Sequence, residues 1–289
     1  MNFILLFIIV ILTTIMWPIT RWAVRRGART HCLGMCISAI GMVVGIISAL
    51  LKGEDIFVIK SMLFGSVMGV AYSVGFCLII FYCLKIGPSG PTVAMNNLGL
   101  LGPVFVSLIW FSKGKSPSTI VISGIAVTLS SLILMVWSRS DSKKDTKNPI
   151  SGRWVIWVFA GWAFSCLSLT CQFLASQYEP DHPYAFLISA FAVSFVILVI
   201  VSLLKGNISP RREEIIAGAY TGCVSGISMP IIFFLLNQMH AAIVYPVTVA
   251  SPIVLVMLIG RYFLKESVNK VGWIASILAV FGIILITTG

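Results

Sequence analysis

Long, continuous runs of apolar residues separated by short polar gaps dominate the chain. Each run is long enough for a membrane-spanning helix, which needs about 20 apolar residues to cross the hydrocarbon core of a bilayer. The apolar positions are continuous rather than alternating, which argues against the strands of a membrane β-barrel. The pattern predicts an all-α membrane protein with ten transmembrane helices, at residues 2–20, 32–51, 61–84, 92–112, 118–137, 154–176, 184–204, 214–236, 242–264 and 271–288.

Composition supports this class and excludes two others. Hydrophobic residues make up 58% of the 289 positions and charged residues only 10%. A soluble domain is about 45–50% apolar and about 25% charged, and a disordered chain is more polar still. The net charge of +11 would suggest nucleic acid in a soluble protein. Here the basic residues lie in the gaps between apolar runs, so we interpret them as an orientation signal and expect no nucleic-acid partner.

The distribution of Lys and Arg predicts how the chain sits in the membrane. Most of the 20 basic residues fall in the odd-numbered loops, and the densest cluster is Arg21, Arg25, Arg26 and Arg29. Short cytoplasmic loops carry an excess of Lys and Arg. We therefore expect the odd-numbered loops to be cytoplasmic and both termini to lie outside, in a plasma membrane such as the bacterial inner membrane.

The longest polar stretch divides the chain into two similar halves. Residues 138–152 form a linker between a first five-helix repeat at 1–137 and a second at 153–289. Gly102-Pro103 in the fourth span recurs as Ser251-Pro252 in the ninth. Because each half contains an odd number of helices, two similar halves must be inverted in the bilayer, which is a common transporter architecture.

Small residues at helical spacing recur in the same helix of each half. The third span contains Gly65 and Gly69, and the eighth contains Gly218, Gly222 and Gly226. Small side chains four positions apart let helix backbones approach closely in lipid. The spacing predicts that these two helices pack tightly against their neighbours.

Charged side chains are missing from the depth of every predicted span. Proton-coupled antiporters commonly need a carboxylate at mid-membrane depth, because an intramembrane charge is costly and usually functional. Its absence favours facilitated diffusion, exchange, or coupling to an ion bound by neutral oxygens. The chain has no HExxH motif, and its seven cysteines have neither disulfide nor metal spacing. We expect no enzyme activity, no cofactor and no metal.

Neutral polar and aromatic side chains within the spans are the candidate substrate ligands. Adjacent amides such as Asn96 and Asn97 both need partners in an apolar helix. The alternative is that Ser and Thr bond their own helix backbone, and that Trp and Tyr are interfacial anchors. The predicted binding residues are Tyr72, Trp162, Ser225 and Ser228 near the centre, with Asn96, Asn97, Tyr245 and Thr248 toward the gates.

Prolines inside the spans are candidate hinges, because each removes a helix hydrogen bond and frees a carbonyl. The hinge candidates are Pro103, Pro230, Pro246 and Pro252. A kink needed only for packing explains them equally well.

The end of the chain resembles a known family. The segments are Ser251-Pro252-Ile253-Val254, Leu264-Lys265-Glu266, Val271-Gly272-Trp273-Ile274 and Gly282-Ile283-Ile284-Leu285. With five helices in each half, this pattern resembles the EamA-type branch of the drug/metabolite transporter superfamily. The resemblance implies transport of small organic solutes by alternating access through a central cavity, and a structural role for Glu266 at a helix end. It also implies cytoplasmic termini, opposite to the charge count.

Three functions follow for comparison. The first is a secondary transporter or facilitator that moves a small neutral or zwitterionic organic metabolite by alternating access. The second is a flippase or exporter of lipid-linked or amphipathic compounds, which shares the fold but needs a side opening to lipid. The third is a membrane scaffold without transport. The expected partners are a small-molecule substrate and the lipid bilayer. The sequence does not decide whether the protein forms a homo-oligomer.

Overall fold

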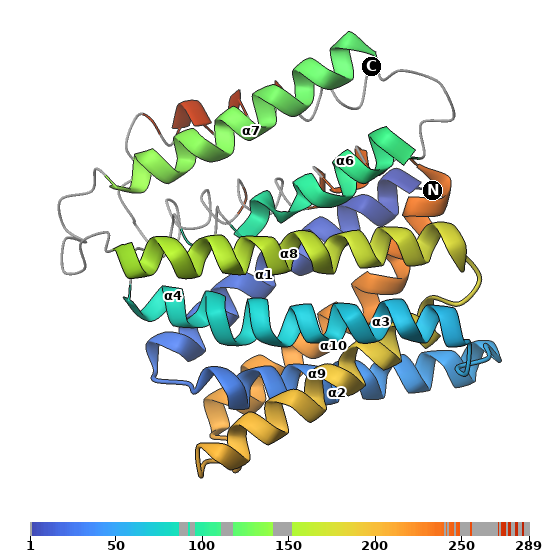
Figure 1. Cartoon of the computed structure of the whole chain (residues 1–289), viewed down its shortest axis with the longest axis vertical. Helices are drawn as coiled ribbons and strands as arrows, with labels where there is room; N and C mark the ends of the chain where they lie inside the picture. The colour runs from blue at the N-terminus through green and yellow to red at the C-terminus, as the bar shows by residue number, and fades with distance from the viewer. Residues whose placement is uncertain are drawn as a thin grey trace.

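A bundle of helices makes up the described part of the protein. The computed structural model describes residues 2–86, 92, 96–110, 118–140, 152–239, 241, 243–245, 247, 248, 255, 271, 273–275, 277, 278, 281, 282 and 285. Within these ranges every regular element is helical and no strand occurs, so the all-α prediction is confirmed. In Figure 1 the long helices run roughly parallel or antiparallel to one another, with α7 at one edge of the molecule and α2 and α9 at the opposite edge.

The helices follow the first eight predicted spans closely. The elements are α1 (Asn2–Arg25), α2 (Thr30–Lys52), α3 (Ile59–Ala71), the π-helix η1 (Tyr72–Ile80), α4 (Phe81–Ile86), the 3-10 helix η2 (Leu98–Leu100), α6 (Leu101–Trp110), α7 (Thr119–Ser140), α8 (Gly152–Tyr178), α9 (Pro183–Leu204) and α10 (Arg212–Gln238). Elements α3, η1 and α4 form one continuous helical run, the third predicted span. The described residues of the last two spans are helical as well.

Membrane crossing is supported for six of the helical runs in the described part of the chain. They are long and apolar enough to span a bilayer: Asn2–Val24, Thr30–Lys52, Ile59–Cys83, Gly152–Tyr178, Pro183–Leu204 and Arg212–Gln238. Their outward side chains are apolar; for example, Leu50 and Leu204 are 74% and 83% exposed. In a bilayer such side chains face lipid rather than water.

Glycines in the left-handed conformation end three of these helices. Gly27, Gly53 and Gly206 have φ values of 85°, 66° and 63° and follow α1, α2 and α9. Only a residue without Cβ adopts this conformation at little cost, and it lets the chain reverse within a few residues. The short connections make each helix antiparallel to the next, as alternating membrane crossings require.

The glycine-rich helices α3 and α10 approach their neighbours at backbone distance. A Cβ atom on Gly222 of α10 would lie 2.6 Å from the carbonyl oxygen of Ile37 in α2. A Cβ on Gly65 of α3 would overlap the carbonyl oxygen of Phe186 in α9. The prediction that these small residues allow close helix packing is confirmed.

The contacts of α3 with α9 have counterparts between α10 and α2. Gly65 meets Ser189 and Gly218 meets Cys36, while Gly69 meets Ala190 and Gly222 meets Ile37. The same difference in residue number separates Gly65 from Gly218 and Gly69 from Gly222. It also separates their contact partners, Cys36 from Ser189 and Ile37 from Ala190. Between α2 and α9 themselves, the buried hydroxyls of Ser38 and Ser194 form a hydrogen bond of 2.9 Å.

Candidate functional site: a cavity and a polar network at opposite ends

A cavity of about 680 Å³ lies where α2 ends and α9 begins. We call this end of the bundle, with residues 52–59 and 178–183, the cavity end. Charged and polar residues form the rim of the cavity, and the middle of α10 forms an apolar wall. The lining residues include Lys52, Glu54, Asp55, Asp181, His182 and Tyr184 on the polar side, and Leu5, Ile227, Pro230, Ile231 and Phe234 on the apolar side.

The carboxylate of Glu54 joins the chain after α2 to the start of α9. It accepts hydrogen bonds from the backbone N–H groups of Tyr184 at 2.9 Å and Ala185 at 3.4 Å. A carboxylate at this position satisfies amides that lack a partner within the helix. Burial raises the pKa of Glu54 above its ordinary value, although these two N–H groups and the nearby His182 and Lys52 act in the opposite direction.

The rim of the cavity offers both signs of charge. The Lys52 ammonium lies 5.2 Å from the centre of the Tyr184 ring, a cation–π contact. Asp55 and Asp181 are exposed beside it. The cavity can therefore hold an apolar group against α10 while its rim binds an ammonium, a carboxylate, or both.

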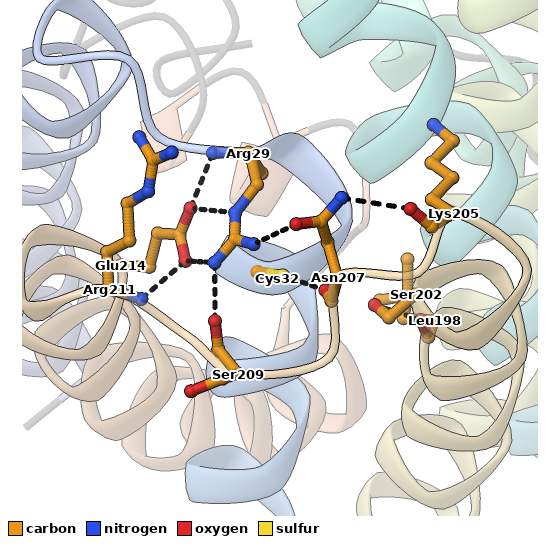
Figure 2. A network of polar contacts seen from close by, with 9 residues as sticks. All are labelled: Arg29, Cys32, Leu198, Ser202, Lys205, Asn207, Ser209, Arg211 and Glu214. Atoms are coloured by element: carbon orange, nitrogen blue, oxygen red, sulfur yellow. Dashed lines mark hydrogen bonds and ion pairs between the residues drawn. The ribbon is translucent and has the colours of Figure 1, made fainter.

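A dense polar network lies at the opposite end of the same helices (Figure 2). Its centre is Glu214 at the start of α10, whose side chain is 0% exposed. One carboxylate oxygen accepts hydrogen bonds from the Arg29 backbone N–H at 2.7 Å and from Arg29 Nε at 3.0 Å. The other accepts from Arg29 Nη2 at 3.0 Å and from the Arg211 N–H at 2.7 Å. Glu214 thus caps α10 and holds the start of α2.

Arg29 extends this network to the chain between α9 and α10. Its Nη1 donates to Asn207 Oδ1 at 3.2 Å, and its Nη2 donates to the Ser209 carbonyl. The Cys32 thiol donates to the Asn207 carbonyl at 3.1 Å. The hydrogen bonds to Glu214 raise the pKa of Arg29 above its ordinary value. We call this the Arg29–Glu214 network, and the end where it lies, with residues 25–30 and 204–212, the network end.

The network was missed in the sequence because its partners are far apart in the chain. The sequence pattern indicates an orientation role for Arg29 and predicts that a span begins at Glu214. The available signal was two adjacent acids, Glu213 and Glu214, in the first turn of an apolar helix, where a carboxylate caps backbone amides. That pattern predicts the start of a helix, but it does not identify the arginine that the carboxylate binds.

The cavity and the network lie at opposite ends of helix α2. It begins beside Glu214 and ends at Lys52 on the rim of the cavity, and its 23 residues span about 35 Å. Helix α10 runs between the same two ends, from Arg212 at the network to Phe234 at the cavity wall. The two features therefore lie on opposite sides of one membrane-length unit.

Three predicted binding residues are hydrogen-bonded within the protein. Asn96 Oδ1 accepts a bond of 2.6 Å from the Ser165 hydroxyl in α8. The Tyr245 hydroxyl donates to the Leu169 carbonyl at 3.0 Å, which ties this residue to α8. Thr248 donates to a carbonyl one turn earlier, that of Val244 at 2.8 Å. For Thr248 this favours the alternative that the hydroxyl bonds its own backbone.

Three others carry buried polar atoms without a partner among the described residues. They are Asn97 Nδ2, Trp162 Nε1 and Ser228 Oγ. The amide of Gln172 in α8, which the sequence did not single out, has the same property and is 2% exposed. Leaving such a group unpaired costs about 1–3 kcal/mol. These atoms are therefore the strongest candidates among buried side chains for a ligand that brings its own polar groups.

The other predicted residues occupy different settings. Tyr72 begins η1 and stacks on Phe76, with ring centres 5.3 Å apart. Ser225 is half-buried in α10. Pro103 is buried in α6, and Pro230 lies inside α10 and lines the cavity. The candidates Pro246, Pro252 and Glu266 lie outside the described residues.

The lining of the cavity, as far as the described residues form it, includes Pro230 but none of the eight predicted binding residues. Their role in binding stays a prediction. In the same part of the chain, no three His, Cys, Asp or Glu side chains gather as metal ligands.

Comparison with known proteins finds a similar fold for the whole chain and a family match for its second half. One solved crystal structure is similar to the chain with a TM-score of 0.75 at 16% sequence identity, covering 99% of this chain and 97% of that one. At this identity the likeness shows the fold alone. No curated protein matches the sequence. The apolar helices indicate an integral membrane protein. Residues 152–288 match the model of the EamA-like transporter family, in agreement with the resemblance to the drug/metabolite transporter superfamily.

Proposed function

We propose that the protein is a secondary transporter or facilitator that moves a small neutral or zwitterionic organic metabolite by alternating access. One observation carries the proposal. The same helices border a cavity at one end and are joined by the buried Arg29–Glu214 network at the other. A binding space accessible from one side and closed on the other is the arrangement that alternating access requires.

The paired helix contacts support an inverted repeat with halves at residues 1–137 and 153–289. Helix α3 packs on α9 as α10 packs on α2, and α8 contacts α3 as α1 contacts α10. In a repeat related by a two-fold axis in the membrane plane, every contact between the halves must occur twice. Such a pair of near-equivalent interfaces gives the molecule two conformations of similar free energy, one open to each side.

The two glycine-rich helices are also irregular at matching positions. The π-helix η1 begins at Tyr72, and the shift that relates Gly69 to Gly222 relates Tyr72 to Ser225. The same shift places Pro230 opposite Cys77, inside η1. Both features break the regular α-helical hydrogen-bond pattern, and such breaks often mark functional sites or bends. They support a bend in each half at the level of the predicted binding residues.

The dimensions and charges of the cavity support a small polar substrate. Ligand cavities typically measure about 300–1,000 Å³, and this one falls within that range. The ammonium of Lys52 and the carboxylates of Asp55 and Asp181 at the rim suit a zwitterion, and the wall of α10 suits an apolar group. Two alternatives remain. A flippase would need a route from this cavity to the lipid, and a scaffold would not use the cavity at all.

The distribution of charge supports an outward-facing cavity. The network end carries Arg26, Arg29, Arg211 and Arg212, whereas the cavity end carries Glu54, Asp55, Glu179 and Asp181. By the positive-inside rule the network end is cytoplasmic. The structure would then represent a state open to the outside and closed to the cytoplasm.

A thermal-shift screen followed by counterflow tests this function. The purified protein is melted with a library of metabolites, because a ligand that binds the folded state raises the melting temperature. Stabilising compounds are then assayed for counterflow in proteoliposomes. Asp181→Asn at the rim should weaken both effects, and Glu213→Gln at the network end is the matched acid-to-amide control. Counterflow of lipid-linked compounds alone would favour the flippase, and stabilising ligands without counterflow would overturn the transport proposal.

A further inference from the structure

We propose that the Arg29–Glu214 network is the gate of the network end, and that Glu54 and His182 form the matching gate of the cavity end. This inference rests on the proposed transport function and names the residues that would control access in it. The gate at the network end is closed in this structure, and its counterpart at the cavity end is incomplete.

The first step is that the network joins the two halves of the chain at the start of two helices. Arg29 is the residue before α2, and Glu214 lies in the first turn of α10. Both oxygens of the carboxylate bind Arg29, through its backbone N–H and two side-chain nitrogens. A passage between these helix ends therefore cannot form until the contact between Arg29 and Glu214 separates.

The second step is that the contact between Arg29 and Glu214 is either fully formed or fully broken, with no stable intermediate. Glu214 is 0% exposed, whereas the Arg29 side chain is 18% exposed. A buried carboxylate is strongly disfavoured without its partners. It must either keep the full set of hydrogen bonds or move into water. A gate that is open or shut, rather than partly open, has this property.

The third step is the counterpart at the cavity end. His182 is the residue before α9, as Arg29 is the residue before α2. Glu54 accepts hydrogen bonds from backbone amides in the first turn of α9, as Glu214 accepts one from the Arg29 amide. Glu54 comes from the chain that follows α2, whereas Glu214 comes from the first turn of α10, the helix that follows α9. At each end a carboxylate thus holds the start of the second helix of the opposite half, although the two carboxylates do not occupy equivalent positions of the repeat.

The fourth step is the difference between the two ends. Arg29 binds its carboxylate through its side chain, but His182 Nδ1 is buried and has no partner among the described residues. His182 lies instead on the lining of the cavity with Glu54. When the cavity end closes, we expect His182 to donate to Glu54 and the Arg29–Glu214 contact to break. One gate is then complete while the other is open.

Cys32 provides a native reporter of the gate at the network end. It lies in the first turn of α2, is 0% exposed, and its thiol contacts the Asn207 carbonyl within the network. We would replace the other six cysteines by serine or alanine and measure labelling of Cys32 by a membrane-impermeant maleimide applied to the network end. No substrate is needed, so the result is independent of the transport assay.

We expect Glu214→Gln to raise the labelling rate of Cys32 by about tenfold or more, because an amide cannot hold the guanidinium as a carboxylate does. Arg29→Lys, which keeps the charge but loses the forked donors, should raise it by a smaller factor. The matched control is Glu213→Gln, the neighbouring acid in the same helical turn, which should label at the rate of the parent. Each variant is first shown to be monodisperse with a cooperative melting transition.

A second measurement keeps the test decisive if Glu214→Gln does not fold. Asn207→Cys in the parent should cross-link to Cys32 under mild oxidation, and Arg29→Lys should lower the yield. Equal labelling and equal cross-linking in parent, Arg29→Lys and Glu214→Gln would overturn the gate while leaving transport to the counterflow assay. A variant that labels readily although no compound shows counterflow would support the gate and count against transport.

Discussion

The substitution Gly222→Ala tests the close packing of α10 on α2. The new Cβ would lie 2.6 Å from the Ile37 carbonyl oxygen and 2.9 Å from the Ile40 side chain, whereas ordinary contacts measure 3.4–4 Å. Because one of these atoms belongs to the backbone, the two helices must separate by several tenths of an ångström. Overpacking of this kind costs about 1–3 kcal/mol. The gain in helix propensity from Gly to Ala recovers up to about 1 kcal/mol.

With the full propensity gain, the expected net loss for Gly222→Ala is roughly 0–2 kcal/mol, measured as a lower melting temperature in detergent. Gly69→Ala in α3 should show a similar fall, since its Cβ would overlap the Ala190 carbonyl in α9. Gly152→Ala is the control, because no atom lies within 4 Å of its Cβ, and it should melt at or slightly above the parent temperature. If all three variants melt alike, the backbone-distance packing of these helices is refuted.

Three further substitutions test other parts of the structure. Ser38→Ala should lower the free energy of unfolding by about 1 kcal/mol, because the Ser194 hydroxyl stays buried without its partner. The double variant Ser38→Ala/Ser194→Ala should melt closer to the parent. A double variant destabilised by the sum of the two single effects would contradict this reasoning. Because burial raises the pKa of Glu54, stability from this carboxyl is greatest below its ordinary pKa and is lost as pH rises through the raised value. Glu54→Gln should therefore reduce the fall in melting temperature that accompanies a rise in pH above the ordinary carboxyl pKa of about 4.3. If Asn97→Ala and Tyr72→Ala both leave counterflow rates unchanged, the predicted binding site is wrong.

The helices could be predicted because each depends on local sequence. A run of apolar residues satisfies its own backbone hydrogen bonds in lipid, so length and hydropathy determine a span. The third span at 61–84 corresponds to a helical run from Ile59 to Ile86, and the eighth at 214–236 to Arg212–Gln238. The close packing at Gly65 and Gly222 could also be predicted, because small residues four positions apart commonly bring helix backbones together in membranes.

The cavity and the network could not be predicted because they depend on which helix ends meet. Glu54 lies near Asp181 and Tyr184 only because α2 ends where α9 begins. The pattern of basic residues in the loops indicates membrane orientation, and the polar residues that it offers as ligands lie within the spans. The π-helix at Tyr72 was equally hidden, since no proline or charge marks it.

The positions of the charged side chains bear on how transport could be driven. Charged pairs such as Arg29–Glu214 lie at the ends of the helices, and the sequence places no carboxylate deep within a predicted span. A proton taken up at mid-membrane depth therefore has no acid to bind. Protonation can act instead at the ends, where it would alter the balance between the two gates rather than move with the substrate. If the proposed transport function holds, we expect facilitated diffusion, exchange, or coupling to an ion bound by neutral oxygens, with pH acting on the rate of transport rather than on the direction in which a gradient drives it.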